Sequence, residues 1–440
     1  MADTLEKIER AGVVGAGGAG FPTHLKLRCH ADTVIANGAE CEPLLNVDQY
    51  TMRDHADEIV AGLEAAMLAT GAKQGVICTK EHYHEAVGAL QRVLNGKSGV
   101  SLKLFRSTYP AGDEQVMVYE VTGKVVPTGG LPLDAGAVVL NVSTLRNVYR
   151  AQQGTPVTSK LVTVTGEVSS PLTIEAPIGT PISALISRAG GPEESGGFVA
   201  IIGGPCMGAL ETDWSAPVTK ITGGIIVLKA DHPLDFMKTD DFERDVRLAK
   251  AVCCQCSLCT QMCPRNALGL NVEPHKAMRA AANGDGKLLG EFNGVFSCCN
   301  CGLCTYYACN FGLNPAAMMT RMKEGLSRAG VKPEKRIAYP VSAGYLLTKL
   351  PVYRLESRLG VTQYEANAPL ISEELDVSRV TIPLKMHIGA PSVPAVVVGT
   401  RVKRGDLIAA IPEGKMGANI HASIDGTVEA IDGKTIILSR

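Results

Sequence analysis

The 440-residue sequence lacks the features that would place it in a membrane or on a nucleic acid. No apolar run reaches the roughly 18 residues of a transmembrane helix, so we expect no membrane-spanning segment. The net charge is −1, and no block of like charges marks a surface for nucleic acid or acidic lipid. The charged first ten residues do not resemble a secretory signal, so we expect a cytoplasmic protein in a reducing compartment.

Tryptophan is also scarce, occurring once, whereas cysteine is abundant. Of the 14 Cys, ten fall between residues 253 and 309 in two runs. Each run contains C-x2-C-x2-C and a later fourth Cys, the spacing with which thiolates bind a [4Fe-4S] cluster. A zinc site would use only half of these thiols, and a disulfide framework is typical of short secreted chains. The sequence therefore predicts two [4Fe-4S] clusters.

The spacing also predicts which thiols share a cluster, because in two-cluster ferredoxins the fourth Cys of each run binds the other cluster. One predicted ligand set is Cys253, Cys256, Cys259 and Cys309. The other is Cys298, Cys301, Cys304 and Cys263. Cys254 and Cys299 fall outside this register, and we interpret them as packing thiols. Cys309 follows Cys304 after four residues rather than three and has no Pro after it, which makes it the weakest predicted ligand.

A glycine-rich stretch, Gly15 to Thr23, is the first candidate for cofactor binding outside the cysteine runs. Glycine lets the backbone approach a phosphate or a flat ring closely, and Lys26 would supply a countercharge. The stretch does not fit the Rossmann fingerprint, because residues 9–14 are too short for a strand and Pro22 interrupts the following helix. A glycine-rich surface loop is the alternative.

The next segments alternate between strand and helix. Strands are expected from Thr33, over 75–79 and over 102–106, and helices over 57–71 and 81–94. Polar clusters follow the strands at Asn37–Pro43 and Tyr109–Glu114. Ligands bind at the carboxyl ends of strands in open α/β sheets, so these clusters are predicted to line a site.

Four motifs of this region resemble the flavin-binding domain of the NADH-oxidising subunit of respiratory complex I. They are Gly15–Lys26, Ala36–Pro43, Tyr109–Glu114 and Leu140–Leu145. The region is still more similar to the C subunit of Rnf complexes and to the cobalamin reductases of propanediol-utilisation microcompartments. The resemblance implies bound FMN and NADH as the substrate that reduces it, and it assigns no catalytic residue.

The resemblance also implies roles for individual residues. Those expected to hold the FMN phosphate and ribityl groups are Gly17, Gly18 and Lys26. Those expected to line the flavin are Asn37, Tyr109, Gly112, Asp113, Asn141 and Thr144. Those expected to face the nicotinamide nucleotide are Phe21, Glu42 and Glu114. The chain departs from the complex I pattern at Ala39, where that pattern has an Asp, and at Asp113, where it has a Glu.

The whole chain is predicted to be a multi-domain protein of the α/β and α+β classes. The predicted units are an α/β flavin domain over 1–155, a β-grasp module resembling the SLBB domain over 156–235, a helical two-cluster ferredoxin-like domain over 236–330, a linker over 331–370, and a barrel-sandwich domain resembling biotinyl and lipoyl domains over 371–440. The last unit is expected from short strands with Gly turns. In the Rnf protein the equivalent domain comes first, so the domain order favours the cobalamin reductases.

The resemblance implies that NADH electrons pass through FMN and the [4Fe-4S] clusters to corrinoid cobalt. Cobalamin, an adenosyltransferase and a microcompartment shell protein are the expected partners, and the inside of a bacterial microcompartment is the expected location. The amphipathic stretch Leu5–Arg10 is either a shell-docking segment or a short capping helix. The alternatives for function are an Rnf-type NAD:ferredoxin subunit and a non-catalytic electron relay or docking module.

Overall fold

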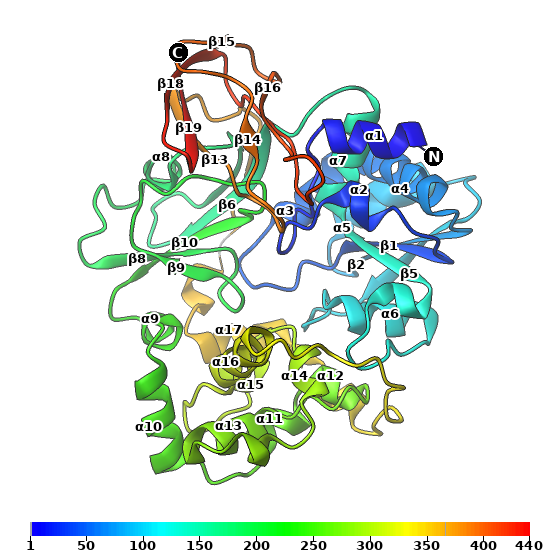
Figure 1. The fold of residues 1–440 in the computed structure, drawn as a ribbon, viewed down its shortest axis with the longest axis vertical. Coiled ribbons are helices and arrows are strands. Elements are labelled where there is room, and N and C mark those ends of the chain that lie inside the picture. The colour runs from blue at the N-terminus through cyan, green and yellow to red at the C-terminus, as the bar shows by residue number, and fades with distance from the viewer. Residues whose placement is uncertain (1, 366) are drawn as a thin grey trace.

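The computed structural model describes residues 2–365 and 367–440. Figure 1 shows the cysteine-rich helices at one end of the molecule, the C-terminal β-domain at the other, and two modules with central sheets between them. Within the described ranges, no helix is both long and apolar enough to cross a bilayer.

The first module is a parallel sheet covered by helices. Its elements are α1 (Ala2–Arg10), α2 (Thr23–Lys26), β1 (Thr33–Gly38), α3 (Val47–Asp54), α4 (Ala56–Thr70), β2 (Gln74–Lys80), α5 (His84–Leu94), β3 (Val100–Phe105), β4 (Thr108–Tyr109), α6 (Glu114–Thr122), η1 (Pro132–Ala135), β5 (Ala137–Asn141) and α7 (Val142–Gln152). The strand order is β3-β2-β1-β5, with every pairing parallel. The inner strands read as apolar runs because helices bury both faces of the sheet.

The order of these strands creates a switch point between β1 and β5. The chain runs outward through β1, β2 and β3, and then returns to place β5 on the other side of β1. Ligands of open α/β sheets bind outside the carboxyl ends of strands at such a point. Asn37 and Asn141, which lie at the ends of these two strands, are register partners there.

The second module is built on a mixed sheet. It contains β6 (Ser159–Gly166), β7 (Leu172–Pro177), α8 (Ile182–Arg188), β8 (Phe198–Ile202), β9 (Ala209–Glu211) and β10 (Gly224–Lys229). The strand order is β12-β7-β6-β10-β8-β9, where β12 is Leu370–Ile371, and β6 and β10 are parallel. Leu185 and Ile186 of α8 are fully buried in the same core as Trp214 and the strands.

Short helices make up the cysteine-rich domain. They are α9 (Pro233–Lys238), α10 (Phe242–Val252), α11 (Leu258–Gln261), α12 (Pro264–Ala267), α13 (Pro274–Asn283), η2 (Gly286–Leu289), α14 (Asn293–Phe296), α15 (Leu303–Tyr306) and α16 (Pro315–Arg328). Proline occupies the first position of α9, α12, α13 and α16, where its missing N–H costs no hydrogen bond. A core that includes Leu268, Leu270 and Met318 holds the helices together.

Residues 331–370, expected as a linker, carry structure of their own. They contain η3 (Tyr345–Thr348), β11 (Leu350–Pro351), α17 (Val352–Leu359), η4 (Thr362–Tyr364) and β12 (Leu370–Ile371). Strand β11 pairs with β4 of the first module, and β12 pairs with β7 of the second. Leu355 is fully buried. The segment therefore connects the two modules by pairing one strand with each of them and by packing its own apolar residues. The sequence prediction of a linker missed these elements.

The C-terminal domain consists of two small sheets, β13-β19-β18-β15 and β14-β16-β17. Its strands are β13 (Arg379–Pro383), β14 (Val393–Pro394), β15 (Arg401–Val402), β16 (Leu407–Ala410), β17 (Ile420–His421), β18 (Gly426–Ile431) and β19 (Thr435–Ser439). Its buried residues join the core of the first module. Helix α1 also contributes to that core through Ile8, so the apolar side of the stretch Leu5–Arg10 is occupied within this molecule.

A buried lysine closes the junction of three units. Lys220, only 3% exposed, donates from Nζ to the carbonyl of Gly12 and to the carbonyl of Asn419, each at 2.7 Å. His421 lies in the same junction, and its Nδ1 has no hydrogen-bond partner among the described residues. Burial, and then the Lys220 charge, lowers the pKa of His421 to about 4.

This junction predicts an acid-dependent loss of stability. An exposed His has a pKa of about 6.5, so between about pH 6.5 and 4 the unfolded chain binds a proton at His421 that the folded chain does not. Stability is therefore fully present above this window, and it falls as the pH drops through it by up to about 1.4 kcal/mol per unit. In urea unfolding from about pH 7 to 4, the unfolding free energy of the wild type should fall relative to that of His421→Gln, because the other titrating groups are common to both proteins. Parallel curves would contradict the prediction.

Candidate flavin and iron–sulfur sites

The glycine-rich stretch forms a closed loop before α2. Phe21 accepts through its carbonyl from the N–H of Gly15 at 3.0 Å, and Val14 pairs with Pro22. A Cβ added to Gly17 would lie 2.8 Å from Nδ2 of Asn141, whereas a Cβ at Gly18 would meet no atom within 4 Å. The loop therefore packs tightly on the switch point at Gly17 and leaves open space at Gly18.

Five predicted flavin residues meet at this switch point: Gly17, Asn37, Gly112, Asn141 and Thr144. The Asn37 amide donates to the Gly112 carbonyl at 2.9 Å. The Thr144 hydroxyl accepts from the N–H of Ala16 at 2.9 Å. These bonds hold amide, carbonyl and glycine groups at the carboxyl ends of β1 and β5. Hydrogen-bonding groups and closely approachable backbone suit the polar side of a flavin, so the residues present fit FMN.

Four ionisable side chains interact with one another beside the glycine loop. Asp48, Lys80 and Lys160 are buried and no pattern in the sequence marks them, whereas Glu40 is half-buried and belongs to the predicted cluster Asn37–Pro43. Lys160, from β6 of the second module, donates to the Ala16 carbonyl at 3.0 Å. Asp48 accepts from the Asn141 amide at 2.9 Å. Burial raises the pKa of Asp48 to about 6 and that of Glu40 to about 8.

Two predicted residues form an ion pair beside the loop. Nζ of Lys26, on α2, lies 2.8 Å from Oε1 of Glu114, the first residue of α6. Both side chains are partly exposed. Phe21 is 37% exposed at the end of the loop, and the neighbouring Gly20 accepts through its carbonyl from the N–H of Ile388 at 3.2 Å. The C-terminal domain therefore borders the loop next to Phe21.

Glu42 and Tyr109 lie where three units meet. The Glu42 carboxylate accepts from the N–H of Cys206 at 2.8 Å and from that of Met207 at 3.1 Å, both in the second module. Its pKa is raised by burial, against the effect of these donors and of Lys238. The Tyr109 hydroxyl donates to the carbonyl of Cys301 at 2.5 Å. The predicted contacts of Glu42 and Tyr109 with nucleotide and flavin stay predictions.

Asp113 contributes to another junction. One carboxylate oxygen accepts from the N–H groups of Gln115 and Val116 and thereby caps α6. The other lies 2.8 Å from Nε of Arg265, in α12 of the cysteine-rich domain. Burial alone would raise the pKa of Asp113, but the Arg265 guanidinium holds it below its usual value. Its expected place beside the flavin remains a prediction, and both oxygens already have partners.

The two cysteine runs fold into matching loops. The residues that flank Cys256 in the first loop and Cys301 in the second have left-handed backbone. They are Gln255 and Ser257 in the first loop, and Asn300 and Gly302 in the second. This conformation costs a non-glycine residue roughly 1–2 kcal/mol, and such strain gathers at functional sites. The N–H of Asn300 points at Sγ of Cys298, 3.4 Å away. Two sequence segments therefore build the same thiol-presenting loop.

The thiols of both runs lie close enough to influence one another. Burial, and then the charges of Cys309, Cys253 and Cys256, raises the pKa of Cys259 to about 12. Burial, and then Cys298, Cys263 and Cys259, raises the pKa of Cys304, so an influence also crosses between the two sets. The division of the thiols into two ligand sets stays a prediction. Four thiols in each set fit a [4Fe-4S] cluster.

All 14 cysteines are free thiols. In the described part of the chain, no three His, Cys, Asp or Glu side chains converge as a single metal ion would need; zinc would require all its thiolates within about 2.3 Å of one point. The interpretation of Cys254 as a packing thiol is wrong, because its side chain is exposed. Cys299 is half-buried, and its thiol bonds to the Asp113 carboxylate.

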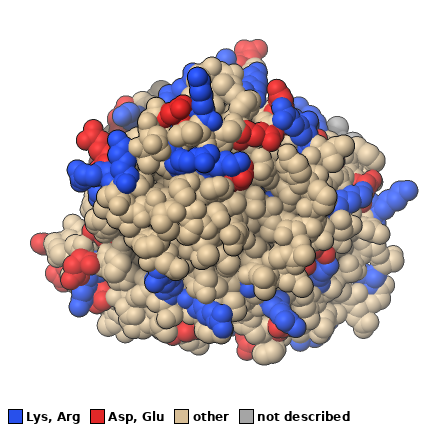
Figure 2. All heavy atoms as spheres, turned by 90° about the horizontal axis from the view of Figure 1, so that it is seen from below, with Lys and Arg blue, Asp and Glu red and all other residues tan. Residues whose placement is uncertain are grey.

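The surface at the end of the molecule where the cysteine-rich domain lies has a central area free of charged side chains. Figure 2 views the molecule from that end and shows a broad central area without Lys, Arg, Asp or Glu. Exposed apolar side chains of this domain are Phe236, Phe242, Val252 and Phe311. Cys256, of the first run, is also exposed. A redox partner can therefore reach the first run without crossing the flavin module.

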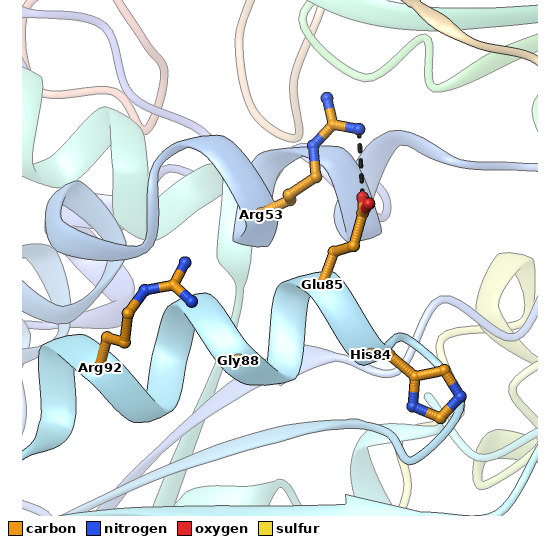
Figure 3. A pocket seen from close by; sticks show the side chains of 5 residues that line it. All are labelled: Arg53, His84, Glu85, Gly88 and Arg92. Atoms are coloured by element: carbon orange, nitrogen blue, oxygen red, sulfur yellow. Dashed lines mark hydrogen bonds and ion pairs between the residues drawn. The ribbon is translucent and has the colours of Figure 1, made fainter.

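The surface hollow of about 440 Å³ between α3 and α5 lies apart from these sites. Figure 3 shows that Arg53 turns toward Glu85 while His84 points away from both, and Arg92 lies further along α5. The side chains do not converge on one point, so the hollow presents no built site.

Four family models match the chain in the order predicted. The Nuo51 FMN-binding domain matches residues 8–150, and the SLBB domain matches 161–209. The 4Fe-4S dicluster domain matches 252–314, and the RnfC barrel-sandwich hybrid domain matches 361–439. These matches confirm the predicted fold class and the predicted FMN and 4Fe-4S domains, whereas the individual site residues and domain boundaries stay predictions.

The chain is also similar to curated proteins over its length. It is 41% identical to cobalamin reductase PduS of Salmonella typhimurium, covering 99% of this chain and 96% of that protein. It is 39% identical to cobalamin reductase PduS of Citrobacter freundii, with the same coverage. A component of the Na(+)-translocating ferredoxin:NAD(+) oxidoreductase complex of Acetobacterium woodii is 35% identical over 62% of this chain and 60% of that protein.

The crossed ligand sets can be tested by replacing single thiols. We expect Cys309→Ser and Cys259→Ser to remove the same electron paramagnetic resonance signal and about half of the bound iron. Cys263→Ser should remove the other signal, the one also lost in Cys298→Ser. Cys254→Ser, outside both sets, serves as the control and should keep all the iron. If Cys309→Ser instead resembles Cys298→Ser, the crossed assignment is wrong.

Proposed function

The chain belongs to the cobalamin reductase PduS family, and we propose that it is an NADH-dependent reductase that delivers electrons through FMN and two [4Fe-4S] clusters to the cobalt of cobalamin. The similarity to two cobalamin reductases over 99% of the chain carries this proposal. Cofactor reactivation during 1,2-propanediol degradation is the process that such a reaction would serve.

The order of the cofactors follows from electron counting. A nicotinamide gives up two electrons as one hydride, whereas an iron–sulfur cluster accepts one electron at a time. Bound FMN supplies the conversion between the two, because a flavin can take two electrons and release them singly. The domain matches include both kinds of cofactor site in one chain.

The residues of the switch point would bind the flavin. Gly17 and Gly18 would admit the phosphate and ribityl groups, with Lys26 as countercharge. Asn37 and Asn141 would hydrogen-bond the ring system. Asp48 orients the Asn141 amide, and Lys160 fixes the loop through the Ala16 carbonyl. These buried bonds preorganise the site, so that binding costs little rearrangement.

The nucleotide side involves partly exposed residues. Phe21 and Glu114 are accessible at the loop, as a site for an exchangeable substrate requires. Glu42 is instead engaged by the N–H groups of Cys206 and Met207. We therefore propose that Phe21 and Glu114 contact NADH directly, and that Glu42 acts by holding the second module in place.

Partners follow from the same proposal. Cobalamin would be the electron acceptor, and an adenosyltransferase would consume the reduced corrinoid. We place the protein inside a bacterial microcompartment next to a shell protein, on the strength of the family alone. The low-charge end of the cysteine-rich domain supports docking of an acceptor there, because little charge must be desolvated.

An Rnf-type role is the second candidate. The 35% identity to the Acetobacterium woodii protein favours it, but that match covers only 62% of the chain. The two functions differ in what the isolated protein does: a reductase acts on cobalamin alone, whereas an Rnf-type component acts within its complex.

The two glycines give a matched test of flavin binding. Gly17→Ala should lower both the FMN content and the thermal stability, because the added Cβ would lie 2.8 Å from Asn141. Gly18→Ala should leave stability unchanged, since nothing lies within 4 Å, but should weaken FMN binding at least severalfold by filling the space proposed for the phosphate. Flavin fluorescence after denaturation measures the content. Full flavin in Gly18→Ala would contradict this placement.

The function itself is tested with the anaerobic full-length protein. We expect NADH to bleach the flavin absorbance and then to reduce added cobalamin, followed by its visible spectrum. Bleaching without cobalamin reduction would favour the Rnf-type function. If NADH does not bleach the flavin, the protein is an electron relay rather than a dehydrogenase.

A further inference from the structure

Direct hydrogen bonds between residues 1–155 and 236–330 are few and gather at one place. In the described part of these ranges they join Tyr109 to Cys301, Gly129 to Ser297, and Asp113 to Arg265 and to the thiol of Cys299. Cys301 belongs to the second cysteine run, Ser297 immediately precedes it, and Arg265 lies two residues after Cys263. The flavin motif Tyr109–Glu114 is therefore attached to the predicted ligand set of Cys263, Cys298, Cys301 and Cys304.

Arg265 is the central residue of this attachment. Its side chain is 12% exposed and that of Asp113 is 2% exposed. Nη2 lies 2.7 Å from the Asp113 carboxylate, and Nη1 donates to the Ser297 carbonyl at 2.6 Å. One planar guanidinium thus bonds both to the flavin module and to the residue before Cys298. Lysine has no such fork and would keep only one of these bonds.

The pair also puts two opposite buried charges beside the predicted cluster. Charges and hydrogen bonds around an iron–sulfur cluster set its reduction potential. The positive Arg265 favours the reduced, more negative cluster, and the negative Asp113 favours the oxidised one. Arg265 and Asp113 therefore shift the reduction potential of the same cluster in opposite directions. If the pair only held the two domains together, removing either charge would not change the potential in this sign-dependent way.

We propose that the Asp113–Arg265 pair is the joint that positions the second cysteine run against the flavin motif, and that Arg265 raises the reduction potential of the cluster held by that run. Arg265 is a positioning residue here, since it acts through the cluster loop and the flavin motif. The inference rests on the proposed function, because it requires that both cofactors are bound.

The test is a potentiometric titration of the two cluster signals in the anaerobic holoprotein, followed by electron paramagnetic resonance. Arg265→Gln should lower the potential of the second-run signal, and Asp113→Asn should raise it. We expect each change to shift the ratio of oxidised to reduced cluster about tenfold, which is about 59 mV for one electron. The signal of the first run, identified through its loss in Cys256→Ser, should stay in place.

Two further variants separate charge from packing. The double variant Asp113→Asn with Arg265→Gln removes both charges and should return the potential close to the wild-type value. Arg146→Gln breaks a comparable ion pair with Glu58, at 11% side-chain exposure, and should lower stability without moving either signal. If Arg265→Gln loses its iron, Asp113→Asn and the double variant still show in which direction each charge shifts the reduction potential of the second-run cluster.

Shifts in the same direction for Arg265→Gln and Asp113→Asn, equal shifts of both signals, or no shift would overturn the proposal. These outcomes differ from a failure of the proposed function, in which the wild-type protein itself lacks flavin or a second cluster and the inference falls with it.

Discussion

The arrangement of this chain depends on ionisable side chains, buried or half-buried, that bond to a neighbouring unit. Lys160 of the second module bonds to the glycine loop, and Lys220 bonds both to the first module and to the C-terminal domain. Glu42 bonds to a turn of the second module, and Arg265 bonds to Asp113 and Ser297. A buried charge without its partner costs several kcal/mol, so each bond fixes one relative placement of two units.

These junctions lie close to the predicted cofactor residues. Asn141, Tyr109 and Asp113 were predicted as flavin contacts, and each also bonds to a side chain or backbone group that stabilises the site or its attachment. Tunnelling between cofactors requires fixed, short separations, and a site built on rigid strands and helix ends supplies them. The same bonds that stabilise the interfaces therefore hold the flavin motif and the second cysteine run at a fixed distance and orientation.

Local patterns predicted much of this structure because their physical causes are local. Apolar runs predicted β1 and β2 nearly to the residue, and the polar cluster after β1 marked Asn37 as a site residue. Asn141, its register partner, was expected only from the family resemblance. Cysteine spacing predicted two loops. Asn tolerates the left-handed backbone found at Asn300, whereas no propensity rule would suggest it at Gln255. The strap over 331–370 was missed because its strands are only two residues long and acquire partners from distant units. Lys160 and Arg265 were missed for a related reason, since a single charge in a sequence does not reveal which distant residue it contacts.

The departure at Asp113 has a physical explanation in these contacts. An Asp at the residue before a helix can accept from the second and third N–H groups of that helix, and it is among the best N-caps, which Glu is not. Asp113 does this for α6 and still presents its second oxygen to Arg265. A Glu at the same position has a longer side chain, which would carry its carboxylate away from the helix N–H groups. The Asp therefore matches a chain in which this position secures a domain interface, and it makes the second cysteine run dependent on the start of α6.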